Sequence, residues 1–292
     1  MTHMTQFKKI LFPVDFSERC LAAVPAVRAM VQQFHSAITV MHVVDLPASG
    51  IGIAPPEAQA WATLIGVDQL REQGSIALKQ FVARHFPGMP VATELAEGDA
   101  ATMIVDVAKD FGADLIMMPT TGLGRFRRLL LGSVTAKVLH DGEMPVWTGV
   151  HAEEIAAHSP ERWKRVLCAV DDQTDGLPVL EWATQFACEQ KLDLRLVHAV
   201  TGPDDWEANP KLRQFLFDVA CEHIGKLQAQ AGTNHEVRIE VGSAPCVVHR
   251  VALQCSADLV VIGRGVIQRS FGRLRSTAYE IIREAPCPVI SV

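Results

Sequence analysis

The chain has 292 residues, which is enough for two domains of ordinary size that each bury a core of their own. An apolar content of 49% with 21% charged residues excludes an intrinsically disordered chain. A net charge of −6 at pH 7 argues against nucleic acid or an anionic membrane as a general partner. No apolar run is long enough to span a bilayer, and residues 1–9 lack the apolar core of a signal peptide, so we expect a cytoplasmic protein.

The first half of the chain alternates short β-branched runs with longer helical patterns, as is typical of parallel strands joined by crossover helices. The predicted elements are, in chain order, a strand at 9–14, a helix at 18–34, a strand at 37–43, a helix at 66–86, a strand at 90–95, a helix at 100–111, a strand at 114–118, a helix at 133–141 and a strand at 145–149. We therefore expect an α/β fold with a doubly wound, parallel, five-stranded sheet.

The second half repeats the first, because residues 164–171 have the same pattern as residues 8–15, an apolar run that ends in an acid. Two intervals between matching residues agree to the residue: 27 positions separate Asp15 from His42 and Asp171 from His198, and 16 separate Gly98 from Asp114 and Gly242 from Asp258. We expect one domain at 1–150, a polar linker at 151–163 and a second domain at 164–292, with two tandem sheets related by a pseudo-two-fold axis.

The residues with chemical character follow the predicted strands, where a doubly wound sheet binds its ligands. Asp15 follows the first strand, and Gly122 and Gly124 lie in the loop after the fourth, where their backbone amides can approach an anion. Gly132 and Ser133 then open a helix whose free N–H groups and dipole favour a phosphate. Nearby arginines add positive charge to an otherwise acidic chain: Arg125, Arg127 and Arg128. A purely structural role of the glycines remains the alternative.

These segments resemble the universal stress protein family. The resemblance rests on Val14-Asp15-Phe16-Ser17, on Met41-His42-Val43-Val44, on Gly122 with nine residues before Gly132-Ser133-Val134-Thr135, and on Met144-Pro145-Val146. ATP-binding members of the family carry Gly-x2-Gly-x9-Gly-Ser/Thr after strand four. The resemblance covers the whole chain, twice. It implies an adenine pocket at Pro13, Val14, Asp15, Val43 and Met118, and a phosphate cradle at Gly122, Gly132, Ser133, Val134 and Thr135.

Two departures from the family pattern concern the cradle. Pro119 replaces its first glycine, which removes one N–H donor and fixes φ. In the second half, Arg275 stands at the position of Gly132 and the loop opening is one residue shorter, so we expect a degenerate second site.

The resemblance implies a stress-response binding protein that holds ATP or another adenine nucleotide, with or without Mg2+, in its first domain, and that is not an enzyme. Two alternatives stay open. One is a slow ATPase or autophosphorylating switch that uses Asp15 and the hydroxyls of Thr121 and Ser133. The other is a nucleotide-free interaction module, which Pro119 favours.

The remaining reactive side chains suggest structural roles. The seven cysteines form no Cys-x-x-Cys pair, and we expect them to be reduced and buried. His42 and His198 end matching strands, which favours half-buried, hydrogen-bonded histidines over metal ligands, and a zinc site at the linker histidines is a weaker alternative.

Each half ends in a short apolar strand without a charged residue, at 145–149 and 288–292. Unprotected apolar edges invite pairing. We expect these strands to pair antiparallel within one chain as an intrachain pseudo-dimer. The apolar insertion at 46–65 could form a lid or join two chains into a homodimer, and a flexible surface loop is the alternative.

Overall fold

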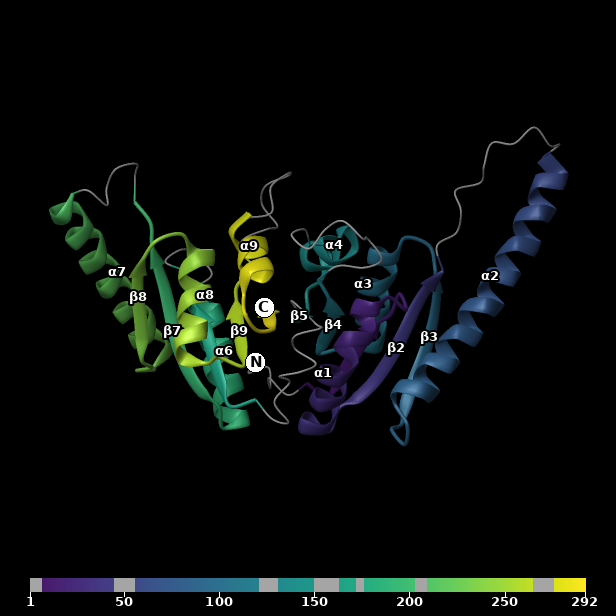
Figure 1. Cartoon of the computed structure of the whole chain (residues 1–292), viewed down its shortest axis with the longest axis horizontal. Coiled ribbons are helices and arrows are strands. Elements are labelled where there is room, and N and C mark those ends of the chain that lie inside the picture. The colour runs from purple at the N-terminus through teal and green to yellow at the C-terminus, as the bar shows by residue number, and fades with distance from the viewer. Residues whose placement is uncertain are drawn as a thin grey trace.

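The computed structural model describes residues 7–44, 56–120, 131–149, 163–171, 176–202, 209–264 and 276–292 (Figure 1). The first half contains β1 (Lys9–Pro13), α1 (Glu18–Phe34), β2 (Ala37–Val44), α2 (Pro56–His85), β3 (Val91–Glu97), α3 (Ala100–Phe111), β4 (Leu115–Pro119), α4 (Ser133–Asp141) and β5 (Val146–Gly149). The second half contains β6 (Arg165–Ala169), α6 (Gly176–Gln190), β7 (Asp193–Val200), α7 (Pro210–Ala231), β8 (Val237–Val241), α8 (Ala244–Cys255), β9 (Leu259–Ile262), α9 (Ser276–Glu284) and β10 (Val289–Ser291).

Capping residues set the ends of α1 and α3. The side chain of Ser17 accepts a backbone N–H at the start of α1, and that of Asp99 does the same for α3. His35 and Gly112 end the two helices in the left-handed region, at φ 52° and 65°. Both helices therefore have the predicted bounds.

Helix α2 corrects the prediction for its region. It begins at Pro56 and not at residue 66, so part of the insertion at 46–65 is helical. The reason is local, because proline is well suited to the first turn of a helix and Glu57, Ala58 and Gln59 are good helix formers. The sequence suggests a lid in this insertion, but residues 45–55 lie outside the described residues.

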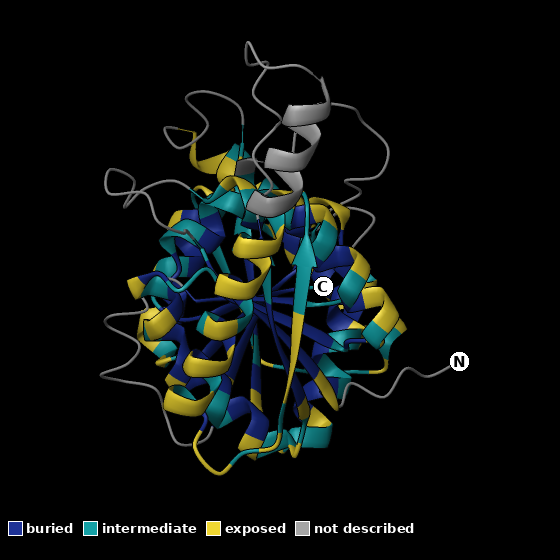
Figure 2. Ribbon diagram, turned by 90° about the vertical axis from the view of Figure 1, so that its right-hand side faces the viewer, coloured by how far each residue is buried: buried dark blue, intermediate teal, exposed yellow. Residues whose placement is uncertain are grey.

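The strands form one ten-stranded sheet in the order β3-β2-β1-β4-β5-β10-β9-β6-β7-β8. Pairing is parallel within each half, and each half has the same strand order, which confirms the doubly wound α/β fold. β5 and β10 pair antiparallel, with Ile290 opposite Trp147, as the sequence predicts for the two final strands. Figure 2 shows buried strands at the centre of the molecule and exposed residues on the outer helix faces.

An aromatic cluster covers one face of the sheet where the halves meet. Phe7 lies 5.2 Å from Phe34 of α1 and 5.4 Å from Phe186 of α6, between ring centroids. Trp182 stacks on Phe186 at 5.1 Å. Trp163 also packs on Phe34 and is buried, although the sequence places it in a polar linker. The rest of that linker lies outside the described residues.

Helices α4 and α9 meet on the other face of the sheet. The Tyr279 hydroxyl on α9 donates a hydrogen bond to the Ala136 carbonyl on α4 at 3.1 Å. The Arg264 guanidinium crosses between the halves and donates to the carbonyls of Gly142 and Met144. The contact between β5 and β10 is therefore covered on both faces.

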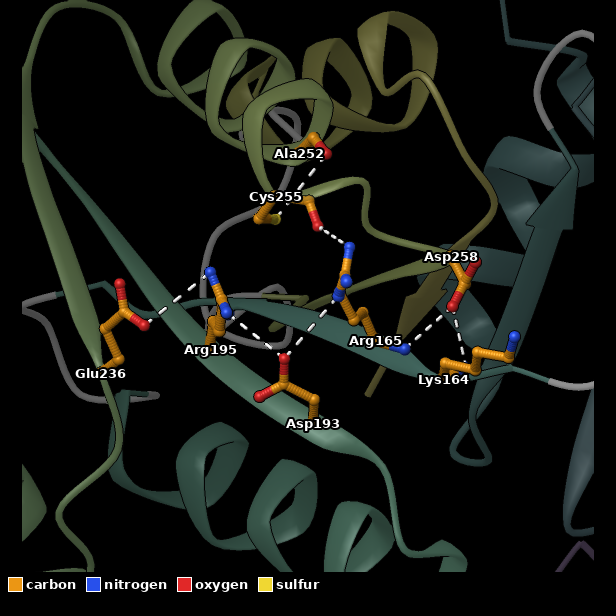
Figure 3. A network of polar contacts seen from close by, with 8 residues as sticks. All are labelled: Lys164, Arg165, Asp193, Arg195, Glu236, Ala252, Cys255 and Asp258. Carbon is orange, nitrogen blue, oxygen red and sulfur yellow. Dashed lines mark hydrogen bonds and ion pairs between the residues drawn. The ribbon is translucent and has the colours of Figure 1, made fainter.

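The amino ends of the strands carry a repeated polar contact. In the second half the Asp258 carboxylate accepts the N–H groups of Lys164 and Arg165, both at 2.8 Å (Figure 3). In the first half Asp114 makes the same contacts to residues 8 and 9, at 2.9 and 2.8 Å. Arg165 and its counterpart Lys9 each donate to a carbonyl at the end of a helix, where the dipole favours a cation. Asp114 and Asp258, which match between the halves of the sequence, therefore have the same structural role.

The cysteines are less buried than predicted. Cys20, Cys168 and Cys287 are buried, and burial raises the pKa of each thiol to about 12. Three others are exposed because they lie on outward faces of helices: Cys188, Cys221 and Cys246.

We expect Ile290→Ala to lower the free energy of unfolding by about 2–5 kcal/mol, because it leaves a cavity opposite Trp147. Ile290 is 0% exposed. Urea denaturation followed by tryptophan fluorescence measures the change. The matched control is Ile76→Ala on α2, a residue 48% exposed, which should change stability by less than about 0.5 kcal/mol. Equal effects of the two substitutions would contradict the buried contact between the halves.

Tyr279 provides an optical test of the contact between α4 and α9, because it is the chain's one tyrosine. Burial raises the pKa of its phenol, and the negative charge of Asp141 adds to this shift. Absorbance at 295 nm should therefore titrate above pH 10 in the folded protein and near 10 in urea. The associated stability is fully present below pH 10 and decreases as the pH rises toward the folded-state pKa. Identical titration curves in the two states would show that the phenol is solvated.

Candidate functional site

The carboxyl ends of β1, β2 and β4 form the candidate site of the first half. The strand order reverses at β1, which lies between β2 and β4, and ligands of doubly wound sheets bind beyond the strand ends at such a point. Asp15, Val43 and Thr120 lie at or just after these three ends. The topology therefore brings together residues that are far apart in the sequence.

The turn after β1 holds Asp15 in a fixed position. Val14 donates its N–H to the Met41 carbonyl at 2.8 Å, which continues the pairing with β2. Phe16 has φ 60°, so the chain reverses sharply before α1. The Asp15 Oδ1 atom then accepts the backbone N–H of Ser17 at 3.0 Å and its hydroxyl at 2.6 Å. The carboxylate is thus held at the edge of the site, partly exposed.

His42 and His198 have the structural role that the sequence predicts. The Nδ1 atom of His42 lies 2.8 Å from the Val14 carbonyl, and that of His198 lies 2.8 Å from the Val170 carbonyl. A carbonyl can only accept, so in each ring Nδ1 carries the proton. These bonds tie the first strand of each half to the second.

The start of α4 is held directly against the end of β4. Gly132 donates its N–H to the Thr120 carbonyl at 2.7 Å, and the buried Thr135 hydroxyl donates to the Pro119 carbonyl at 3.0 Å. Gly132 is the N-cap of α4 and has no side chain with which to cap it. The first N–H groups of a helix lack intrahelical partners, so those of Ser133 and Val134 are suited to an anion.

Lys137 and Asp99 form an ion pair between α4 and the start of α3 that the sequence does not predict. The Lys137 ammonium on α4 lies 2.7 Å from the Asp99 carboxylate at the start of α3 and 3.1 Å from the Thr102 hydroxyl. Hydrogen bonds from Lys137 and Thr102 hold the pKa of the Asp99 carboxyl well below its usual range. The helix-cap pattern of Asp99 is visible in the sequence, but its partner 38 positions later is not.

The predicted nucleotide-binding residues that the structure describes lie at this one edge of the sheet. Their burial differs: Pro13, Val14, Met118 and Thr135 are buried, Asp15, Val43, Gly132 and Val134 are intermediate, and Ser133 is exposed. The loop residues Gly122 and Gly124, with Thr121 and the three arginines, lie outside the described residues. Across the described part of the chain, no three His, Cys, Asp or Glu side chains are grouped to hold a metal ion.

A cavity of about 490 Å³ lies at the equivalent edge of the second half. The carboxyl ends of β6, β7 and β9 form its walls together with α8 and α9. The small residues Ala169 and Ala199 line it where the first half has Pro13 and Val43. Comparison of the two halves of the sequence predicts a degenerate phosphate cradle here, but it does not predict this cavity.

A model of the universal stress protein family matches the chain twice, over residues 6–148 and 162–292. The chain belongs to the universal stress protein family. This confirms the resemblance that the motifs indicate. Within the described residues, no helix combines the length and the hydrophobicity of a membrane span.

Curated relatives and solved structures agree with this assignment. A universal stress protein of Methanocaldococcus jannaschii is 34% identical over 143 residues, which are 48% of this chain and 80% of that protein. One of Mycolicibacterium smegmatis is 28% identical over 185 residues, 62% of this chain and 58% of that protein. The crystal structure of a universal stress protein from Archaeoglobus fulgidus superimposes with a TM-score of 0.67 at 24% identity. The match covers 98% of this chain and 96% of that protein. The fold is therefore shared over both halves.

We expect Thr135→Val to reduce the free energy of unfolding by about 1–3 kcal/mol, because the Pro119 carbonyl loses its donor in a buried position. Valine has nearly the shape of threonine, so the change isolates the hydrogen bond. Thr93→Val on the exposed face of β3 is the control and should have an effect below about 0.5 kcal/mol. Urea denaturation compares the two, and an unchanged midpoint for Thr135→Val would mean that this bond does not hold α4 on β4.

Proposed function

We propose that this universal stress protein binds ATP or a related adenine nucleotide in its first half and acts as a stress-response regulatory module. The observation that carries the proposal is the position of α4, which begins at an uncapped glycine directly beside the end of β4. A phosphate placed there would accept the N–H groups of residues 133–135 and face the positive end of the helix dipole.

The family's ATP-binding pattern supports the same placement. Gly122, Gly132 and Ser133 match the later positions of Gly-x2-Gly-x9-Gly-Ser/Thr, while Pro119 replaces its first glycine. Pro119 is the last residue of β4, and its carbonyl accepts the Thr135 hydroxyl. The substitution therefore costs one N–H donor at the strand end and leaves the donors at the start of α4 in place.

The adenine and ribose would lie nearer to β1 and β2. Val14 and Met118 offer apolar surface, and Val43 is partly exposed beside them. Asp15, held by Ser17, can accept a hydrogen bond from a ribose hydroxyl. With Mg2+ bound to the phosphates, the same carboxylate is an oxygen ligand of the kind that this ion prefers.

We further propose that the nucleotide is bound without rapid turnover. Hydrolysis needs a base that takes a proton from an attacking water. The Oδ1 atom of Asp15, the carboxylate that follows β1, is already engaged by two donors of Ser17. The bound nucleotide would then report its cellular concentration to a partner. A cytoplasmic location, an intrachain pseudo-dimer and a further homodimer are part of the same proposal.

The experiment is isothermal titration of the full chain with ATP, for which we expect about one nucleotide per chain. Gly132→Arg should weaken binding at least 100-fold, because the side chain would occupy the place of the phosphate. Gly132 has φ −62°, so arginine causes no backbone strain, and the second half has Arg275 at this position. The control is Gly225→Arg on α7, where an added Cβ atom meets nothing within 4 Å. If Gly132→Arg keeps the ATP affinity within threefold, the cradle lies elsewhere.

A further inference from the structure

The cavity of the second half has an apolar wall of a size that suits a flat ring. Its volume of about 490 Å³ lies within the range of small-molecule sites. Val170, Ala199 and Ile262 line it from the ends of three strands, and Val248 lines it from α8. These side chains make no hydrogen bonds, so the wall favours an aromatic group over water.

The charges around this cavity differ from those of the first half. Glu280 lines the cavity at the position that Lys137 occupies on α4, counted from the start of each helix. Ser243 stands where the first half has Asp99, the partner of Lys137. A balanced ion pair in the first half is thus replaced by a single negative charge. Asp171 also lines the cavity, but its counterpart in the first half is Asp15, so the difference in charge lies at Glu280.

Arg264 is the one arginine or lysine that lines the cavity among the described residues, and its two terminal nitrogens donate to backbone carbonyls. It donates to the Gly142 and Met144 carbonyls of the first half and to the Ser291 carbonyl at 3.2 Å. Burial lowers its pKa to about 10, so it stays charged at neutral pH. The two terminal nitrogens of Arg264 therefore serve the contact between the halves, and its Nε atom is buried without a hydrogen-bond partner.

Hydroxyl groups and a histidine complete the lining. Thr201, Ser243 and Thr277 contribute hydroxyls, which donate or accept as a ligand requires. His198 also lines the cavity, and its Nδ1 proton is used by the Val170 carbonyl. A ligand that presents hydroxyl or amino donors would therefore find acceptors on several sides.

We propose that the second-half cavity binds an uncharged, ring-bearing molecule with hydroxyl and amino donors, of the nucleoside class, and rejects its phosphorylated forms. The apolar wall takes the ring, and Glu280 accepts donors from the ligand together with the hydroxyls of Thr201, Ser243 and Thr277. Glu280 repels a phosphate at the position where the first half has Lys137. This site is separate from the proposed ATP site of the first half, so each can fail without the other.

The first experiment determines which half of the chain binds adenosine, the probe for the nucleoside class. Titration calorimetry of the full chain with adenosine is compared for Ala199→Trp and Val43→Trp, which place the same bulk at equivalent positions of the two halves. We expect Ala199→Trp to abolish the binding that survives in Val43→Trp. Loss in Val43→Trp alone, or no adenosine binding to the unmodified chain, overturns the proposal without touching the ATP result.

The second experiment tests the preference for uncharged adenosine over charged ATP, and its substitutions change charge without adding a bulky ring to the cavity. In the Gly132→Arg chain, adenosine should bind at least tenfold more tightly than ATP. Glu280→Lys should reduce that preference at least tenfold, whereas Glu222→Lys on α7, an exposed site outside the cavity lining, should leave it unchanged. Residues 265–275 contain Arg269, Arg273 and Arg275. If these hold a phosphate at the cavity, ATP will bind more tightly than adenosine and the proposal is wrong.

Discussion

The antiparallel pairing of β5 with β10 joins two five-stranded sheets into one and determines how the rest of the molecule is arranged. Only three residue pairs make this contact, which is too short to hold two domains by backbone hydrogen bonds alone. The aromatic cluster around Phe186 covers one face, and α4 with α9 covers the other. Burial of these side chains supplies most of the stabilisation, and the strand pairing supplies the geometry.

The two halves agree where they build the sheet and differ at the two proposed ligand sites. Asp114 and Asp258 make the same contacts to the start of a strand, and His42 and His198 make the same contact to the end of one. Matching positions differ near the carboxyl ends of the strands: Lys137 against Glu280, Asp99 against Ser243 and Thr120 against Arg264. The sequence also has Arg275 in place of Gly132. The residues that hold the sheet have therefore stayed the same in the two halves, while the residues at the proposed sites have changed.

The sequence predicts the fold well because short local patterns mark where many helices and strands begin and end. Ser17 and Asp99 are helix caps whose effect is confined to neighbouring residues, so the bounds of α1 and α3 follow from spacing. The predicted start of α2 was wrong because a stretch rich in Gly and Pro favours a loop, although Pro56 can also begin a helix. The bond between Lys137 and Asp99 and the cavity beside Ala199 could not be predicted, because both depend on how distant elements pack.

Arg264 shows what covalent fusion of the halves makes available. In a homodimer of identical subunits, every side chain at the symmetric contact occurs twice, and two guanidinium groups would approach each other near the axis. In this chain the equivalent position in the first half is Thr120, so a single arginine reaches across to Gly142 and Met144. Joining two copies in one gene removes the requirement that a change be tolerated on both sides at once. One copy can then mutate toward a new ligand while the other keeps the old one.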